Sequence, residues 1–232
     1  MPAIITHHLF GEEVYAELAS VVGTGERERD AFLLGNIGPD PLFGLRVLPS
    51  SVAYRGIGTT MHAQKPTELL AALHWQFVAL DGRRNPAVAA YALGFLCHYL
   101  LDLSVHPLVF AQQFAFCDAG VEGLTRDHGG SEVHALIETE LDEYVLTTHR
   151  GVTVDAFEPH CETLRCADSD LADISASLAR AVGNAYALEV PPSAFATAVR
   201  LYRAAQVVFD SKRSGVRARF DYARLAGRRY LH

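Results

Sequence analysis

The 232 residues include 20 Lys and Arg against 27 Asp and Glu, so the formal net charge is −7, and half of the sequence is apolar. This composition excludes a largely disordered chain and predicts a globular protein with a sizeable core. The acidic balance argues against a general nucleic-acid scaffold, so we expect no stable complex with nucleic acid.

The expected location is the cytoplasm. The first residues lack the basic and apolar regions of a secretory signal. The most apolar stretch, residues 86–97, is too short to span a bilayer, so no transmembrane segment is predicted. The four cysteines form no CxxC pair. We expect free thiols, with pairing or soft-metal binding by Cys161 and Cys166 as the less favoured alternative.

Helical periodicity dominates the first half of the sequence. Apolar residues at helical spacing predict helices over residues 7–22, 28–36 and 66–80. Asn85 followed by Pro86 is a typical helix start, and it opens an apolar helix predicted through Leu103. Pro107 is expected to break or kink this helix, which would place His106 at a helix end.

The second half continues in the same way. Gly120 to Gly130 is predicted to be a polar loop, and Ser131 to cap a helix that ends near Thr147. Further helices are expected over residues 169–186, 192–210 and 214–226. Alternating strand patterns and Asn-Gly hairpin turns are absent from the sequence. The prediction is an all-α fold with one domain over residues 1–232, built around the buried helix 86–103.

Histidines and carboxylates recur at four-residue steps in two places. His98, Asp102 and His106 follow one another at this spacing within an apolar segment, and His134 precedes Glu138 by the same step. Side chains four residues apart share one face of a helix. Ionisable groups among apolar residues are costly unless they are compensated, and a divalent cation compensates them simply. Histidine and carboxylate ligands suit zinc, so the pattern predicts a metalloprotein.

Other polar residues stand in unusual places. His7 follows Thr6 at the start of a helix, Asp40 lies in a turn fixed by one glycine and two prolines, and His62 precedes a predicted helix. Each residue also has an ordinary interpretation. His98 and Asp102 can be a buried hydrogen-bonded pair, the His134 pair an exposed helix face, Asp40 a turn residue and His62 a surface histidine. His8 is the alternative to His7.

The order of these residues resembles the zinc-dependent phospholipase C family, whose fold is shared with fungal single-strand nucleases. The family pattern is an N-terminal His, an Asp in a Gly-Pro-Asp turn, a lone His, His-x3-Asp, a further His and finally His-x3-Glu. The sequence contains every part of it in order, from Thr6-His7 through Glu138. The resemblance implies an all-α fold and two to three zinc ions, for which manganese or iron can substitute.

The resemblance also implies how the ligands are shared. One ion would be held by Asp40, His62, His98 and Asp102, and a second by His106, His134 and Glu138. A third would be held by His7 and Asp102, with Asp102 as the bridge. In the secreted enzymes an N-terminal Trp completes the third site, whereas this sequence has Met1-Pro2 there. The remaining ligands of the third site therefore stay open.

The activity that the resemblance implies is hydrolysis of phosphoric esters by a metal-activated water. Asp40 and Asp102 are the expected catalytic carboxylates, with Asp40 as a candidate base. The expected substrate is a small phosphate ester or a phospholipid. The aromatic residue that follows the turn Asp in the secreted choline-specific enzyme is here Pro41, so no matching residue supports a choline headgroup. A single-strand nuclease or nucleotidase and a non-catalytic metal-binding domain are the alternatives.

Overall fold

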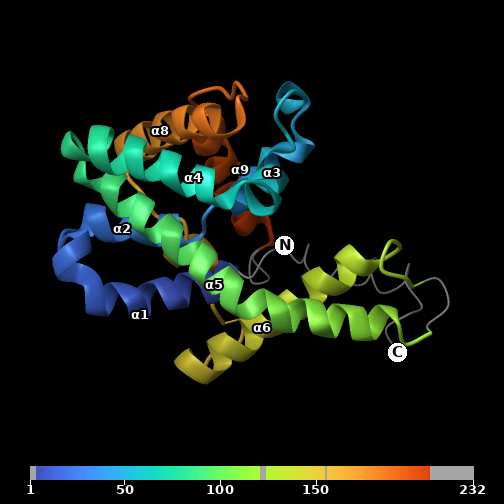
Figure 1. The fold of residues 1–232 in the computed structure, drawn as a ribbon. Helices are drawn as coiled ribbons and strands as arrows, with labels where there is room; N and C mark the ends of the chain where they lie inside the picture. The colour runs from blue at the N-terminus through green and yellow to red at the C-terminus, as the bar shows by residue number, and fades with distance from the viewer. Residues whose placement is uncertain (1–3, 121–123, 155, 210–232) are drawn as a thin grey trace.

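The structure is a computed structural model that describes residues 4–120, 124–154 and 156–209. These residues form nine α-helices and several short 3₁₀ or π segments, and no strand occurs among them (Figure 1). The all-α prediction is confirmed. The predicted helix 214–226 lies outside the described residues.

The first two helices pack against the start of a much longer one. α1 (Ile4–Val22) and α2 (Glu26–Asn36) correspond to the first two predicted helices, and α5 (Pro86–Cys117) follows later in the chain. Glycines let α2 and α5 approach closely. A Cβ added to Gly94 would lie 2.0 Å from the carbonyl oxygen of Phe32, and one added to Gly35 would lie 2.2 Å from that of Tyr91. The backbones of α2 and α5 lie so close together here that residues larger than glycine would not fit at these two positions.

The segment between α2 and α5 is built from short helical pieces. It contains η1 (Asp40–Val47), η2 (Pro49–Ser51), α3 (Ile57–Ala63), α4 (Pro66–Leu73), η3 (His74–Leu80) and η4 (Asp81–Arg83). The predicted helix 66–80 is thus an α-helix that continues as a π-helical segment. Residues 40–63 lack a periodic apolar pattern, and their helices were not predicted. These pieces carry two of the predicted ligands, Asp40 and His62.

Pro107 does not end α5. The helix continues to Cys117 with Pro107 inside it, so His106 lies within the helix and the expected break is wrong. The ribbon of α5 changes direction along its length, as proline-containing helices commonly do (Figure 1). The continuation is held by packing, because Val109, Gln113 and Cys117 lie on one helix face and are buried.

The remaining helices are α6 (Gly130–Arg150), α7 (Pro159–Glu162), α8 (Asp168–Tyr186) and α9 (Ala194–Phe209). They match the predicted ranges except for the short α7, which was not predicted. The predicted cap of α6 is wrong. Its N-cap is Gly129, with φ of +80°, and Ser131 lies inside the helix. All four cysteines are free.

The core gathers around the first half of α5. Tyr91 is fully buried, and its ring lies 5.5 Å from those of Phe77 and Phe195 and 5.9 Å from that of Phe95. Among the described helices, α5 alone is long and apolar enough to cross a membrane, by length and composition only. The place of its first half at the centre of this core accounts for much of that apolar character.

The other side of α5 exposes an apolar stripe. We use this name for six exposed residues that recur every three or four positions and so share one helix face: Leu96, Leu100, Leu103, Pro107, Phe110 and Phe114. Leu103 is 75% exposed, which is unusual for so large an apolar side chain on a regular helix. The stripe runs beside the face that carries His98, Asp102 and His106.

Candidate metal centre

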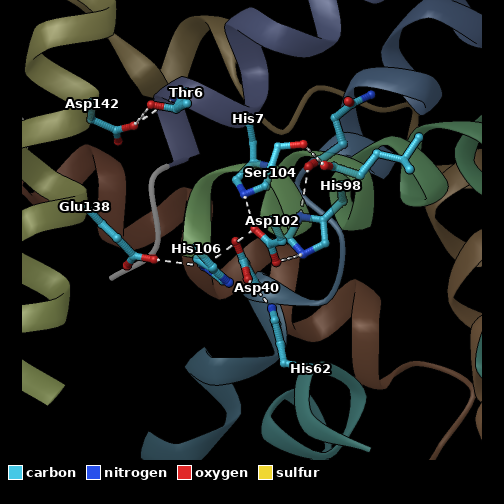
Figure 2. A network of polar contacts seen from close by, with 12 residues as sticks. Thr6, His7, Asp40, His62, His98, Asp102, Ser104, His106, Glu138 and Asp142 are labelled. Carbon is cyan, nitrogen blue, oxygen red and sulfur yellow. Dashed lines mark hydrogen bonds and ion pairs between the residues drawn. The ribbon is translucent and has the colours of Figure 1, made fainter. Parts of the chain in front are cut away.

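Five elements bring the eight predicted ligands together. α1 provides His7, η1 Asp40, α3 His62, and α5 three residues (Figure 2). α6 provides His134 and Glu138, of which Figure 2 labels Glu138. The ligand atoms fall into three groups, within each of which they lie no more than 4.8 Å apart: His7, Asp40 and His98; His62, His98 and Asp102; His106, His134 and Glu138. The last group contains the three residues expected to hold the second ion.

Asp102 lies at the centre of the arrangement. Its carboxylate oxygens are 3.2 Å from Nε2 of His7, 3.2 Å from Nε2 of His98 and 3.7 Å from Nε2 of His106. Burial by itself raises the pKa of the Asp102 carboxyl. The neighbouring His7 and His98 outweigh burial and hold that pKa well below its usual range. Asp102 is therefore a carboxylate, as a bridging ligand must be.

Asp40 is the most deeply buried carboxylate of the centre. It is 2% exposed, and neither of its oxygens has a hydrogen-bond partner, although Oδ1 lies 3.0 Å from Nε2 of His62. The turn before it approaches His98 closely. Gly38 has φ of +57°, and a Cβ there would lie 2.4 Å from Cγ of His98. Glycine at this position lets the turn deliver Asp40 against the imidazoles of the centre.

The second group lies between α5 and α6. Nε2 of His134 is 3.1 Å from Oε1 of Glu138, and Nε2 of His106 is 3.5 Å from the same oxygen. Burial raises the pKa of Glu138, but its contacts with His106 and His134 dominate and lower the pKa to about 2. The contact with Glu138 in turn raises the pKa of His106. At neutral pH Glu138 is charged and able to bind a cation.

Three imidazoles are fixed from behind through Nδ1. Nδ1 of His62 lies 2.7 Å from the carbonyl oxygen of Gly58, and Nδ1 of His98 lies 3.2 Å from that of Asn36. Nδ1 of His134 lies 2.9 Å from Oε1 of Gln113. An acceptor at Nδ1 leaves Nε2 as the ring nitrogen that faces the carboxylates. This is the usual way in which proteins orient histidine ligands.

These features fit a bound cation. Nε2 of His98 lies 3.2 Å from a carboxylate oxygen of Asp102 without hydrogen-bond geometry, and neither oxygen of Asp40 has a hydrogen bond, although Oδ1 faces Nε2 of His62. Burying a neutral polar group without a hydrogen bond costs on the order of 2–7 kcal/mol, and burying an unpaired charge costs more. Metal ions remove that cost, and histidine with carboxylate is a donor set that suits zinc.

The start of α1 is held by α6. Asp142 accepts hydrogen bonds from the amide of Thr6 at 2.8 Å, from the hydroxyl of Thr6 at 2.7 Å and from the amide of Ile5 at 3.2 Å. This contact fixes the helical turn that carries His7 (Figure 2). His8 points elsewhere, because its Nε2 lies 3.8 Å from Glu12. Met1 and Pro2 lie outside the described residues, so the rest of the predicted third site is not described.

Four partners of the centre were missed from the sequence. Gln113 and Asp142 are buried side chains, and Asn36 and Gly58 act through backbone oxygens. Helical spacing was a usable signal for the first two, because Gln113 lies seven residues after His106 and Asp142 four after Glu138. Gln113 was missed because the helix predicted from the sequence ended before Pro107. No comparable pattern marks a backbone carbonyl.

A surface hollow of about 470 Å³ shares none of its lining residues with the centre. Its wall includes Arg27, Arg165 and Arg203. Each of these arginines already donates to a group of the same chain: Asp170, Glu26 and the carbonyl oxygen of Leu164, in that order. The chemistry of the donor groups, rather than the size of a cavity, therefore identifies the candidate site.

Sequence comparison supports the same chemistry. Residues 6–186 match a protein family described as zinc dependent phospholipase C, and this range covers more than half of the chain. It includes all eight predicted ligands and extends to the end of α8. No curated protein and no solved structure matches the chain.

Proposed function

Because the chain belongs to the zinc-dependent phospholipase C family, we propose that it hydrolyses phosphoric esters with zinc held by the grouped histidines and carboxylates. The observation that carries this proposal is the position of His106. Its Nε2 lies 3.7 Å from Asp102 and 3.5 Å from Glu138, so it joins the two donor groups (Figure 2). Groups this close can act on one phosphoryl group.

Each residue has a proposed role. Asp40, His62, His98 and Asp102 would hold one ion, and His106, His134 and Glu138 a second, while His7 with Asp102 would contribute to a third. Manganese or iron could replace zinc with these ligands. Zinc, when bound, supplies a Lewis acid for the phosphoryl oxygen and lowers the pKa of a coordinated water. Asp102 would neutralise the cations as their shared ligand, and Asp40 is a candidate proton acceptor through an oxygen without a hydrogen bond.

The apolar stripe supports an ester with an apolar organic group. Phe110 is 42% exposed, and its ring centroid lies 5.6 Å from that of His106 and 5.1 Å from that of His134. An exposed apolar surface that reaches the ligands of the second ion can contact the organic part of a substrate. We therefore propose a phospholipid or a small phosphate ester with an apolar group as the substrate.

The test is hydrolysis of bis(4-nitrophenyl) phosphate by the zinc-loaded protein. We expect a rate that increases as a group with a pKa of about 7 loses its proton. His134→Ala should reduce the rate by about 100-fold or more, because it removes a ligand that supports charge stabilisation at the phosphoryl group. His74→Ala is the matched control, since His74 is exposed and belongs to none of the donor groups.

The outcomes separate the alternatives. Fully loaded protein that hydrolyses no phosphate ester would favour a non-catalytic metal-binding domain. Turnover unaffected by His134→Ala would place the second donor group outside the active centre. Vesicles of phosphatidylcholine and single-stranded DNA, assayed in parallel, distinguish a phospholipase from a nuclease.

A further inference from the structure

Gln113 occupies a special place between α5 and α6. Its side chain is 8% exposed, and its Oε1 lies 2.9 Å from Nδ1 of His134. On the other side of the ring, Nε2 of His134 faces Glu138 at 3.1 Å. The imidazole is therefore held between an amide oxygen and the carboxylate of the second donor group.

This contact differs in kind from those at the other oriented histidines. The partners of Nδ1 in His62 and His98 are backbone carbonyl oxygens, which can only accept a hydrogen bond. They can pair only with a protonated Nδ1. Gln113 instead offers an amide with one accepting and one donating end. The end of the amide that faces Nδ1 therefore decides whether His134 can donate a hydrogen bond there.

The oxygen end of the Gln113 amide is the end that faces His134. Its Nε2 end points towards the start of α6, where a Cβ added to Gly130 would lie only 3.2 Å from it. Gly130 leaves room for the amide group, and the oxygen end remains directed at His134.

We propose that Gln113 is a positioning residue for the second metal ion. With a cation at Nε2, the amide oxygen of Gln113 would accept a hydrogen bond from Nδ1 of His134 and hold the ring in place beside Glu138 and His106. This inference rests on the metal centre proposed above and not on the hydrolytic activity. Partners of this kind commonly change metal affinity by about 10- to 100-fold when they are removed.

The experiment compares three variants in zinc titrations against a competing chelator. Gln113→Leu removes the acceptor at similar size, and we expect it to weaken binding of one zinc ion by about 10- to 100-fold. Gln113→Glu keeps an oxygen at this place and should restore binding to at least the wild-type level. Gln112→Leu is the matched control, because Gln112 is the exposed neighbour on the same helix, and it should bind zinc as the wild type does.

A second readout does not involve zinc affinity. Long-range proton–nitrogen NMR spectra of the zinc-loaded protein show whether the Nδ1 proton of His134 is held in a hydrogen bond and protected from exchange with water. We expect slow exchange of this proton in the wild type and in Gln112→Leu, and faster exchange in Gln113→Leu. A role in packing alone would lower the melting temperature of Gln113→Leu without this change in exchange.

Two results would overturn the inference. One is a Gln113→Leu protein that binds every zinc ion with wild-type affinity. The other is an Nδ1 proton of His134 that exchanges as slowly in that variant as in the wild type. If the wild-type protein itself binds no zinc, both this inference and the proposed metal centre are wrong, and that result is distinct from the first two.

Discussion

The carboxylate of Asp142 anchors Thr6, accepting one hydrogen bond from its amide at 2.8 Å and another from its hydroxyl at 2.7 Å. The contact joins two segments that are 136 residues apart in the sequence. His7 is the next residue, and its Nε2 lies 3.2 Å from Asp102. A buried carboxylate on α6 thus determines where the first histidine of the centre lies.

Replacing Asp142 with Ala should therefore affect both stability and the centre. The change leaves buried donors of Ile5 and Thr6 without their acceptor, and each such loss costs about 1–3 kcal/mol. We expect a lower free energy of unfolding in urea and a lower zinc content. Glu143→Ala, which changes the exposed neighbour, is the control. Equal stability of the two variants would contradict the anchoring role.

The stability contributed by Asp142 should also depend on pH. Burial raises the pKa of this carboxyl to about 6, against the hydrogen bonds from Thr6 and Ile5. In the unfolded chain the pKa of an Asp carboxyl is about 3.9. The folded state therefore binds the Asp142 proton more tightly than the unfolded chain does. The resulting stabilisation of the folded state is complete below pH ~4 and is lost as the pH rises through 6.

The measurement is urea unfolding of metal-free wild type and Asp142→Asn across this range. Their difference in unfolding free energy should fall with rising pH by on the order of 3 kcal/mol, because only the wild type titrates at this position. Titrations elsewhere in the protein cancel in the difference. A difference that does not change between pH 4 and pH 8 would mean that Asp142 keeps an ordinary pKa in the fold.

Asp102 should matter more for metal content than any other single ligand. It contacts His7, His98 and His106 and is the proposed bridge between ions. We expect the wild type to contain two to three divalent ions and Asp102→Ala to lose more metal than His62→Ala, as measured by elemental analysis of the purified proteins. Retention of full metal content by Asp102→Ala would rule out the bridged arrangement.

Removal of the metal should destabilise the protein. Asp40 is 2% exposed and has no hydrogen bond to either oxygen, so a chelator would remove compensation of its charge beyond the ion pair with His62. Ions that bind the folded state preferentially also raise its stability by mass action. We expect a lower melting temperature after chelation, and a smaller decrease in Asp40→Asn, whose side chain is neutral. An unchanged melting curve after complete removal of the ions would contradict this account.

The sequence by itself determined the fold class and most of the donor groups of the candidate metal centre. The four-residue steps of His98, Asp102 and His106 and of His134 and Glu138 are local, because a helix places such residues on one face whatever surrounds them. The helical periodicity of the long segments is equally local. For the same reason the ranges of α1, α2, α8 and α9 follow closely from the apolar pattern.

The tertiary structure decided what the local pattern left open. Whether α5 continues past Pro107 depends on the burial of Val109, Gln113 and Cys117, which is a property of the packed protein. The orientation of His62 and His98 depends on the backbone oxygens of Gly58 and Asn36. Because every residue has such an oxygen, the residue type does not predict this contact. Contacts between segments far apart in the sequence arise only when the helices pack, because no local preference encodes them.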